Sequence, residues 1–293
     1  MKIVKLKGGL GNQMFQYSYA KLIERLSNEE VKLDYSAFQT LQDDAVRVPR
    51  IAKFNLTLKA ATNEDLKKIF LFNHRGNSLS YIYKFGIFLE SKINKKYFWE
   101  PNRAYISPES VVDYEYFDGY WQSWRYIESI RNEILNDFTP NYELSQQTKL
   151  TKKIMQEENS VFVGVRRGDY AEERSHYGSF ESEYYLRAMK TIEEREKNPV
   201  YYIFSNDIPW CKENLDWGGR SVIYREKELQ TDDFEELMLM ASCKHAIIIN
   251  SSYHWWGASL ISNADKIICC PEKWWFDDAP IDIIPEKCYR IKV

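Results

Sequence analysis

Apolar segments alternate with amphipathic stretches along the second half of the chain, and this alternation constrains the fold more than any other feature. The expected strands are residues 161–165, 200–205, 221–224, 246–249 and 266–269. The expected helices lie between them, at about 182–197, 209–215, 233–243 and 254–261. Strands separated by helices of this length are typical of βαβ units, which build a parallel sheet. The second half is therefore expected to be an α/β domain.

The N-terminal segment GGLGNQMFQ, residues 8–16, carries a second α/β signal directly after the apolar stretch 3–6. Four apolar residues at helical spacing then indicate a helix: Phe15, Tyr19, Leu22 and Leu26. A glycine-rich turn between a strand and a helix exposes backbone N–H groups at the positive end of that helix. Asn12 and Gln13 add side-chain amides, which suit a polar ligand such as a sugar.

The familiar nucleotide-binding motifs do not match this glycine-rich turn. A dinucleotide fingerprint needs a third glycine three residues after Gly11, and that position holds Met14. A P-loop ends in Gly-Lys-Ser/Thr, whereas here Gly11 is followed by Asn12 and Gln13. A tight turn between strand and helix that binds no ligand remains an alternative.

The length of 293 residues favours two domains. The break Thr139-Pro140-Asn141 follows an expected helix at 126–136, and we place the domain boundary near residue 155. The domains are then 1–155 and 156–293. Residues 31–33 are a further expected strand, whereas most of the stretch 43–116 has too weak a periodicity to assign.

Composition excludes several classes of protein. The net charge of −3 argues against a nucleic-acid partner. Five cysteines without C-x-x-C spacing fit neither a disulfide scaffold nor a zinc site, and they suit a reducing cytoplasm. No apolar run has the length of a membrane span or resembles a signal peptide. We therefore expect a soluble cytoplasmic protein, and peripheral contact with the inner membrane stays open.

Polar residues follow three of the expected strands in the second half. They are Arg166 and Arg167, then Ser205, Asn206 and Asp207, then Asn250, Ser251 and Ser252. Ligands of open α/β sheets bind beyond the carboxyl ends of the strands. Arginines, hydroxyl groups and a helix N-terminus at one edge describe an anion site, most plausibly for a diphosphate.

Each of these signals also has a purely structural interpretation. Alternation along a strand should aim Arg166 and Arg167 at opposite faces, and salt bridges, for example with Asp169, could explain both. Ser251 and Ser252 could be N-cap residues. Asp232 and Glu235 have the spacing of a capping box for the helix that follows. The four histidines lack metal-ligand spacing and no D-x-D is present, so we expect no metal.

Four segments together resemble the bacterial α-1,2-fucosyltransferases of glycosyltransferase family 11. They are GGLGNQMFQ at 8–16, FDGYWQS at 117–123, VRRGDY at 165–170 and NSSYHWWGASL at 250–260. The resemblance implies a GT-B-like α/β architecture, with two Rossmann-like domains facing across a cleft. It implies GDP-β-L-fucose as the donor, the 2-hydroxyl of a galactose-containing glycan as the acceptor, and inversion without metal or other cofactor. Domain 1–155 would be on the acceptor side and domain 156–293 would bind the nucleotide-sugar.

The resemblance also implies roles for individual residues. Arg166 looks like the arginine that binds the diphosphate and stabilises the leaving GDP, and Asn12 belongs to the loop that closes on the donor. Glu236 stands where related enzymes have an acidic residue that reads the guanine edge. Besides the two catalytic candidates Arg166 and Asn12, the expected substrate-binding residues are Gly9, Leu10, Gly11, Gln13, Arg167, Asp169, Ser205, Asn206, Asp207, Glu236, Asn250, Ser251, Ser252 and Trp256.

Gly164 departs from the family pattern, which usually has histidine two residues before the arginine pair. A histidine contact to the nucleotide is therefore missing or replaced. This keeps two alternatives open, an inactive relative that binds a GDP-sugar or glycan, and a transferase for another GDP-sugar. The residues do not identify a general base, for which Asp34 and Asp118 are candidates.

Overall fold

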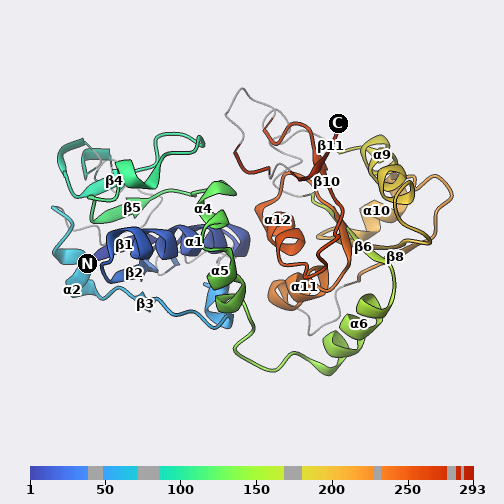
Figure 1. The fold of residues 1–293 in the computed structure, drawn as a ribbon, viewed down its shortest axis with the longest axis horizontal. Helices are drawn as coiled ribbons and strands as arrows, with labels where there is room; N and C mark the ends of the chain where they lie inside the picture. Colours follow the sequence, from blue (N-terminus) through green and yellow to red (C-terminus); the bar gives the residue numbers. More distant parts are fainter. Residues whose placement is uncertain are drawn as a thin grey trace. The chain divides into compact units, whose positions relative to one another are not determined.

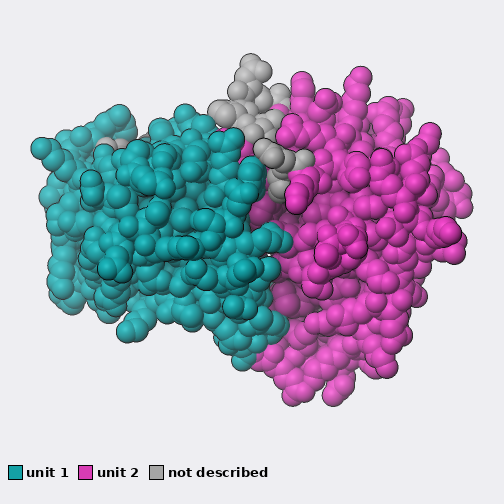
Figure 2. Space-filling model, viewed as in Figure 1, with its two compact units in different colours: residues 1–141 teal, residues 142–293 magenta. Residues whose placement is uncertain are grey.

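The computed structural model in Figure 1 describes the chain in segments: residues 1–38, 49–71, 86, 88–90, 92–167, 180–226, 232–275, 282–284 and 287–293. The chain forms two compact units, Met1–Asn141 and Tyr142–Val293, which Figure 2 colours separately. In the described residues no helix combines the length and the apolar character that crossing a bilayer requires.

The boundary expected near residue 155 falls inside helix α6, Gln146–Glu157, which belongs to the second unit. The contacts of Glu235, in helix α11, give the physical reason. Its carboxylate accepts hydrogen bonds from the backbone N–H and the hydroxyl of Ser145, at 2.9 and 2.7 Å, and from the hydroxyl of Thr148. These bonds tie the N-terminus of α6 to the second unit.

The first unit contains a parallel sheet in the order β3-β2-β1-β5-β4. Its strands are β1 Lys2–Lys5, β2 Val31–Asp34, β3 Lys59–Ala60, β4 Tyr97–Trp99 and β5 Tyr116–Asp118. Its helices are α1 Leu10–Ser27, α2 Asn63–Lys67, α4 Arg125–Glu128 and α5 Arg131–Asp137, with 3-10 turns at Ser36–Phe38, Arg50–Lys53 and Pro108–Ser110. The expected strand, glycine-rich turn and helix at the N-terminus are confirmed as β1 and α1.

The single helix expected at 126–136 is two short helices, α4 and α5. The N–H of Ile130 bonds to the carbonyl of Ile127 at 3.1 Å, which is the tighter 3-10 pattern, so the chain bends between the helices. Ile127, Ile130 and Ile134 are all buried. The expected helical character of this stretch is therefore confirmed, but the bend was not predicted.

The second unit contains a six-stranded parallel sheet in the order β11-β10-β9-β6-β7-β8. Its strands are β6 Ser160–Val165, β7 Val200–Ser205, β8 Val222–Tyr224, β9 His245–Ile247, β10 Ile268–Pro271 and β11 Tyr289–Ile291. Besides α6, its helices are α9 Ser182–Glu193, α10 Ile208–Asn214, α11 Asp233–Met240 and α12 Ser252–Ser259. Counted from β6, this is the doubly wound order 3-2-1-4-5-6 of a Rossmann fold. The α/β prediction for the second half is confirmed.

Helices cover both faces of this second sheet, with α9 and α10 on one side and α11 and α12 on the other (Figure 1). Val161, Val163 and Val165 of β6 share a hydrophobic cluster with residues of α9 and α10. Gly164 lies on the opposite side of the strand, against α12. The alternation along β6 therefore decides which face each residue beyond its end approaches.

Candidate functional site

The strand order of the second unit reverses between β6 and β9, which are direct neighbours. Such a switch point is where doubly wound sheets bind ligands, beyond the carboxyl ends of the strands. Arg166 and Arg167 follow β6 there, and the segment that follows β9 leads through Ser251 into α12. The predicted grouping of these residues at one sheet edge is thereby confirmed.

Arg166 and Arg167 approach opposite faces of the sheet, as the alternation predicts. The guanidinium of Arg167 lies over the ring of Trp210 in α10, 4.1 Å from its centroid. Its backbone N–H donates to Asn206 Oδ1 at 2.8 Å. Arg166 is on the α12 side, where its charge adds to the effect of burial in lowering the pKa of His254 to about 3. Of the two arginines, Arg166 is thus the one beside the start of α12.

The polar side chains of the turn after β7 form hydrogen bonds with neighbouring backbone groups. Ser205 Oγ accepts a hydrogen bond from the N–H of Asp207 at 3.0 Å. The carboxylate of Asp207 caps α10 by accepting from the N–H of Trp210 at 3.1 Å. With the bond from Arg167 to Asn206, these contacts give all three predicted residues a structural role, and their contact with a ligand stays a prediction.

Ser251 and Ser252 lie at the start of α12, next to the switch point. Ser251 is the N-cap residue by position, but its side chain makes no capping hydrogen bond within the described chain. The interpretation of Ser251 as a simple side-chain cap is therefore wrong, and Ser252 opens the helix. Asn250 Nδ2 donates to the carbonyl of Trp274 at 3.0 Å, which anchors the segment between strand and helix.

The remaining predicted residues of the second unit have different surroundings. Trp256 is only 1% exposed and packs against Trp255, which gives it a structural role, and its contact with substrate stays a prediction. Glu236 lies in the first turn of α11, where a carboxylate oxygen is 3.9 Å from Nη2 of Arg225. Asp169 lies outside the described residues.

Arg225 was missed by the sequence reasoning. It directly follows β8, so an arginine after the end of an apolar strand was the signal that could have found it. On α11, the carboxylate of Asp232 accepts from the N–H groups of Phe234 and Glu235, so half of the expected capping box is confirmed. The expected capping bond of Glu235 is wrong, because its carboxylate accepts hydrogen bonds from Ser145 at the start of α6 instead.

The glycine-rich turn of the first unit lies at the equivalent switch point, between the neighbouring strands β1 and β5. Gly8 has φ +80°, which a side chain would rarely tolerate. Gly9 is the N-cap of α1, and a Cβ added there would meet no atom within 4 Å. Asn12 Oδ1 accepts a hydrogen bond from Gln122 Nε2 at 2.7 Å. The turn after β1 and the part of the FDGYWQS segment that follows β5 are therefore joined at this edge.

Two residues predicted to bind substrate at this turn are structural. Gln13 is 1% exposed, donates to the carbonyl of Gly8 at 2.9 Å and accepts from the N–H of Ile51 at 3.2 Å. Leu10 is part of the buried core, and Gly11 is buried with it. Both side chains are buried at the first turn of α1, and their contact with a substrate stays a prediction.

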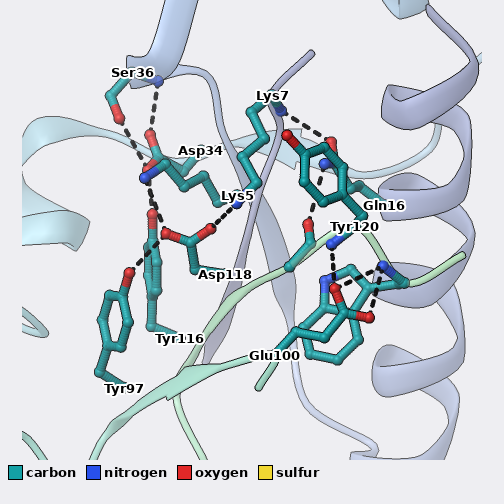
Figure 3. A network of polar contacts seen from close by, with 12 residues as sticks. Lys5, Lys7, Gln16, Asp34, Ser36, Tyr97, Glu100, Tyr116, Asp118 and Tyr120 are labelled. Carbon is teal, nitrogen blue, oxygen red and sulfur yellow. Dashed lines mark hydrogen bonds and ion pairs between the residues drawn. The ribbon is translucent and has the colours of Figure 1, made fainter. Parts of the chain in front are cut away.

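A charged network occupies the carboxyl edge of the first sheet (Figure 3). Asp118 pairs with Lys5 at 3.0 Å and Lys7 at 2.6 Å, and accepts from the hydroxyl of Tyr97 at 2.7 Å. Burial raises the pKa of Asp118, but these two ammonium groups outweigh it and hold the pKa well below its usual range. A carboxylate of such low proton affinity is a poor general base, so the structure argues against Asp118 in that role.

The other expected base and one unexpected carboxylate lie in the same network. Asp34 accepts hydrogen bonds from the N–H and hydroxyl of Ser36 and from the hydroxyl of Tyr116. Glu100, just after β4, accepts from the N–H groups of Tyr120 and Trp121 at 2.6 and 3.2 Å (Figure 3). Burial raises the pKa of Glu100 to about 7. It falls in the stretch that the sequence left unassigned.

Two α/β units, each with a parallel sheet and a turn at its switch point, are typical of the GT-B class of glycosyltransferases. The fold resembles the crystal structure of fucosyltransferase NodZ from Bradyrhizobium, with a TM-score of 0.51 and 11% identity, over 87% of this chain and 91% of that one. The family model for glycosyl transferase family 11 matches residues 1–290. The chain belongs to this family.

Characterised relatives cover nearly the whole chain. An alpha-1,2-colitosyltransferase of Escherichia coli is 31% identical, over 99% of this chain and 98% of its own length. The O-antigen biosynthesis glycosyltransferase WbnK of Escherichia coli is 29% identical, over 92% and 93%. The galactoside 2-alpha-L-fucosyltransferase Sec1 of Mus musculus is 25% identical, over 89% of this chain and 64% of its own length. Sugar transfer is the activity these relatives share, and this chain is a glycosyltransferase.

Proposed function

We propose that this protein transfers L-fucose from GDP-β-L-fucose to the 2-hydroxyl of a galactoside, with inversion at the anomeric carbon. Membership of family 11 and the mouse galactoside 2-alpha-L-fucosyltransferase among its relatives support the sugar and the linkage. The observation that carries the proposal is the position of Arg166, which follows β6 at the switch point of the second sheet, on the side of α12. The free thiols of all five cysteines suit a cytoplasmic setting for this reaction.

The chemistry follows from charge. Departure of GDP builds negative charge on the β-phosphate, and preorganised donors must stabilise it. In the proposed complex Arg166 supplies a guanidinium and the N-terminus of α12 supplies backbone N–H groups, both suited to phosphate oxygens. We propose that these groups suffice without a metal ion. In the described residues no set of three or more His, Cys, Asp or Glu side chains is arranged to hold one.

We propose that the second unit binds the nucleotide and the first unit presents the acceptor. Glu236 would accept hydrogen bonds from the N1–H and 2-amino groups of guanine, with the guanidinium of Arg225 3.9 Å from its carboxylate. The acceptor would meet the edge of the first sheet where Asn12 and Gln122 are bonded to each other.

A second candidate donor is the colitosyl analogue, because the 31% identical relative is an alpha-1,2-colitosyltransferase. Colitose differs from fucose by lacking the 3-hydroxyl. A site built to hydrogen-bond that hydroxyl rejects the analogue by about 10⁴–10⁵, whereas a site without such a partner discriminates weakly. The two donors are therefore separable by kinetics.

A donor panel tests the proposal. The purified protein is given GDP-fucose, GDP-colitose, GDP-mannose and UDP-galactose with a galactoside acceptor, and nucleoside diphosphate release is measured. We expect the highest kcat/KM with GDP-fucose. A higher value with GDP-colitose would assign the protein to colitosyl transfer. Binding of GDP without turnover of any donor would identify an inactive relative.

A further inference from the structure

Gly164 is a glycine because another side chain fills the space beside it. A Cβ added at this position would lie 2.5 Å from Nδ1, 2.7 Å from Cγ and 2.8 Å from Cε1 of His254. The strand is regular here, since Gly164 is paired with Phe204 in the parallel ladder between β6 and β7. The requirement for glycine therefore comes from the imidazole ring, which stands directly over the strand.

The imidazole of His254 thus occupies the place from which a side chain at residue 164 would have extended. His254 belongs to the first turn of α12, and Gly164 lies two residues before Arg166 on the same side of the strand. The family pattern that this chain resembles has histidine at the position of Gly164. In this protein an imidazole is present at the same place, but a different element supplies it.

The surroundings of His254 point to a role beyond packing. The side chain is buried, and Nδ1 has no hydrogen-bond partner in the described part of the chain. A buried acceptor or donor left unsatisfied destabilises a fold, so such a group calls for a partner in the working state. The ring is neutral, because burial and the charge of Arg166 keep its pKa low. A neutral imidazole can accept a hydrogen bond from a guanidinium without repelling it.

We propose that His254 replaces the missing histidine of the arginine motif and is a positioning residue, which holds Arg166 and the first turn of α12 for the diphosphate of the donor. This inference rests on the proposed function, because it assumes that the donor is a GDP-sugar. It explains the glycine at 164 by the imidazole of His254, which a neighbouring element supplies.

The test is an exchange experiment. Gly164→His, His254→Ser and the double variant are compared with wild type in GDP binding by calorimetry, in kcat and KM, and in melting temperature. His254→Ser is expected to weaken GDP binding at least about tenfold, the effect of losing a hydrogen bond to a charged group. Gly164→His alone is expected to melt earlier, because two rings cannot share the space. The double variant is expected to recover both properties to within about threefold of wild-type affinity.

A second buried histidine provides the matched control. His245 begins β9, at the opposite end of the strand from the switch point, and its Nδ1 accepts from the N–H of Ile267 at 3.0 Å. His245→Gln is expected to lower the melting temperature without changing the affinity of the folded protein for GDP.

Two results would overturn the inference, and they differ. If His254→Ser binds GDP as wild type does, or if the double variant is no better than Gly164→His, His254 only fills space. If the wild-type protein itself binds no GDP, the proposed donor is wrong, and the role of His254 toward it falls with the donor.

Discussion

At the scale of single residues, the two adjacent arginines have different roles. Arg167 is held over Trp210 and bonded to Asn206, so it connects the ends of β6 and β7. Arg166 lies on the other face, beside His254 and the start of α12. One substitution at each position should therefore separate stability from catalysis.

We expect Arg166→Ala to lower kcat at least about a hundredfold, because loss of one preorganised donor typically costs about 2.7–4 kcal/mol. Arg166→Lys should recover only part of this, since an ammonium lacks the bidentate fork. Arg167→Ala should mainly lower the melting temperature. Steady-state kinetics and thermal unfolding of the three variants test these expectations. A larger loss of kcat in folded Arg167→Ala than in Arg166→Ala would mean that the two roles are reversed.

Acid should destabilise the protein partly through His254. Burial, helped by the charge of Arg166, lowers its pKa from 6.5 to about 3 in the folded state. Between these values the unfolded chain binds more protons, so stability falls as pH drops through this window, by up to about 1.4 kcal/mol per unit from this residue. Above pH 6.5 His254 is neutral in both states, so it no longer makes the free energy of unfolding depend on pH.

Urea unfolding of wild type and His254→Ser at pH 7.5, 6 and 5 measures this effect. The stability difference between the two proteins should be constant above pH 6.5 and should shift in favour of the variant below it. Parallel pH dependence of the two free energies would show that His254 titrates normally.

At the scale of secondary-structure elements, α6 depends on one carboxylate of α11. Glu235 accepts both hydrogen bonds of Ser145 and one from the hydroxyl of Thr148, so it satisfies the polar groups at the start of this helix. We expect Glu235→Ala to cost about 1–3 kcal/mol of unfolding free energy, since it leaves these donors unpaired. Chemical denaturation measures the loss.

The control for this prediction is Glu157→Ala at the other end of α6, where the carboxylate is exposed and 3.9 Å from Lys153. Its effect should stay within about 0.5 kcal/mol. Equal losses in the two variants would mean that Glu235 does not tie α6 to α11.

The sequence indicated most elements of the second unit, because strands buried on both faces are continuous apolar runs between amphipathic helices, but it missed α6 and β11. It indicated the first unit poorly. The strands Lys59–Ala60 and Tyr97–Trp99 are only two and three residues long, too short for any periodicity. The bend between α4 and α5 leaves the apolar spacing intact, so the spacing could not reveal it.

The site could be predicted in part for the same reason. Positions directly after strands, such as Arg166, follow from the topology of a parallel sheet. The inward direction of Gln13 and Trp256 depends on how each helix packs, which the motif alone does not contain. The pairing of Gly164 with His254 joins residues far apart in the chain, and only the packing of α12 on β6 brings them together.

At the scale of the whole molecule, each unit has a parallel sheet with a switch point, and the charges at the two edges differ. The edge of the second sheet carries arginines, which suits phosphate. The edge of the first sheet carries Asp34, Asp118 and Glu100 with Lys5 and Lys7 (Figure 3). This difference in charge supports the proposal that the second unit binds the nucleotide and the first unit binds the acceptor.

Sugar transfer should not depend on a divalent metal, since Arg166 and the N-terminus of α12 would neutralise the charge of the leaving group. We expect the initial rate to change little in excess EDTA. Assays with EDTA and with added Mg²⁺ or Mn²⁺ measure this directly. Strict dependence on added metal would remove Arg166 from its proposed role as the main charge-stabilising group.

The most direct test of the central claim is the structure of the product. The protein is incubated with GDP-β-L-fucose and a galactoside acceptor, and the linkage and anomeric configuration of the product are determined by NMR. We expect a single product with α-linked fucose on the 2-hydroxyl of galactose. A β-linked product, or fucose on another hydroxyl, would contradict it.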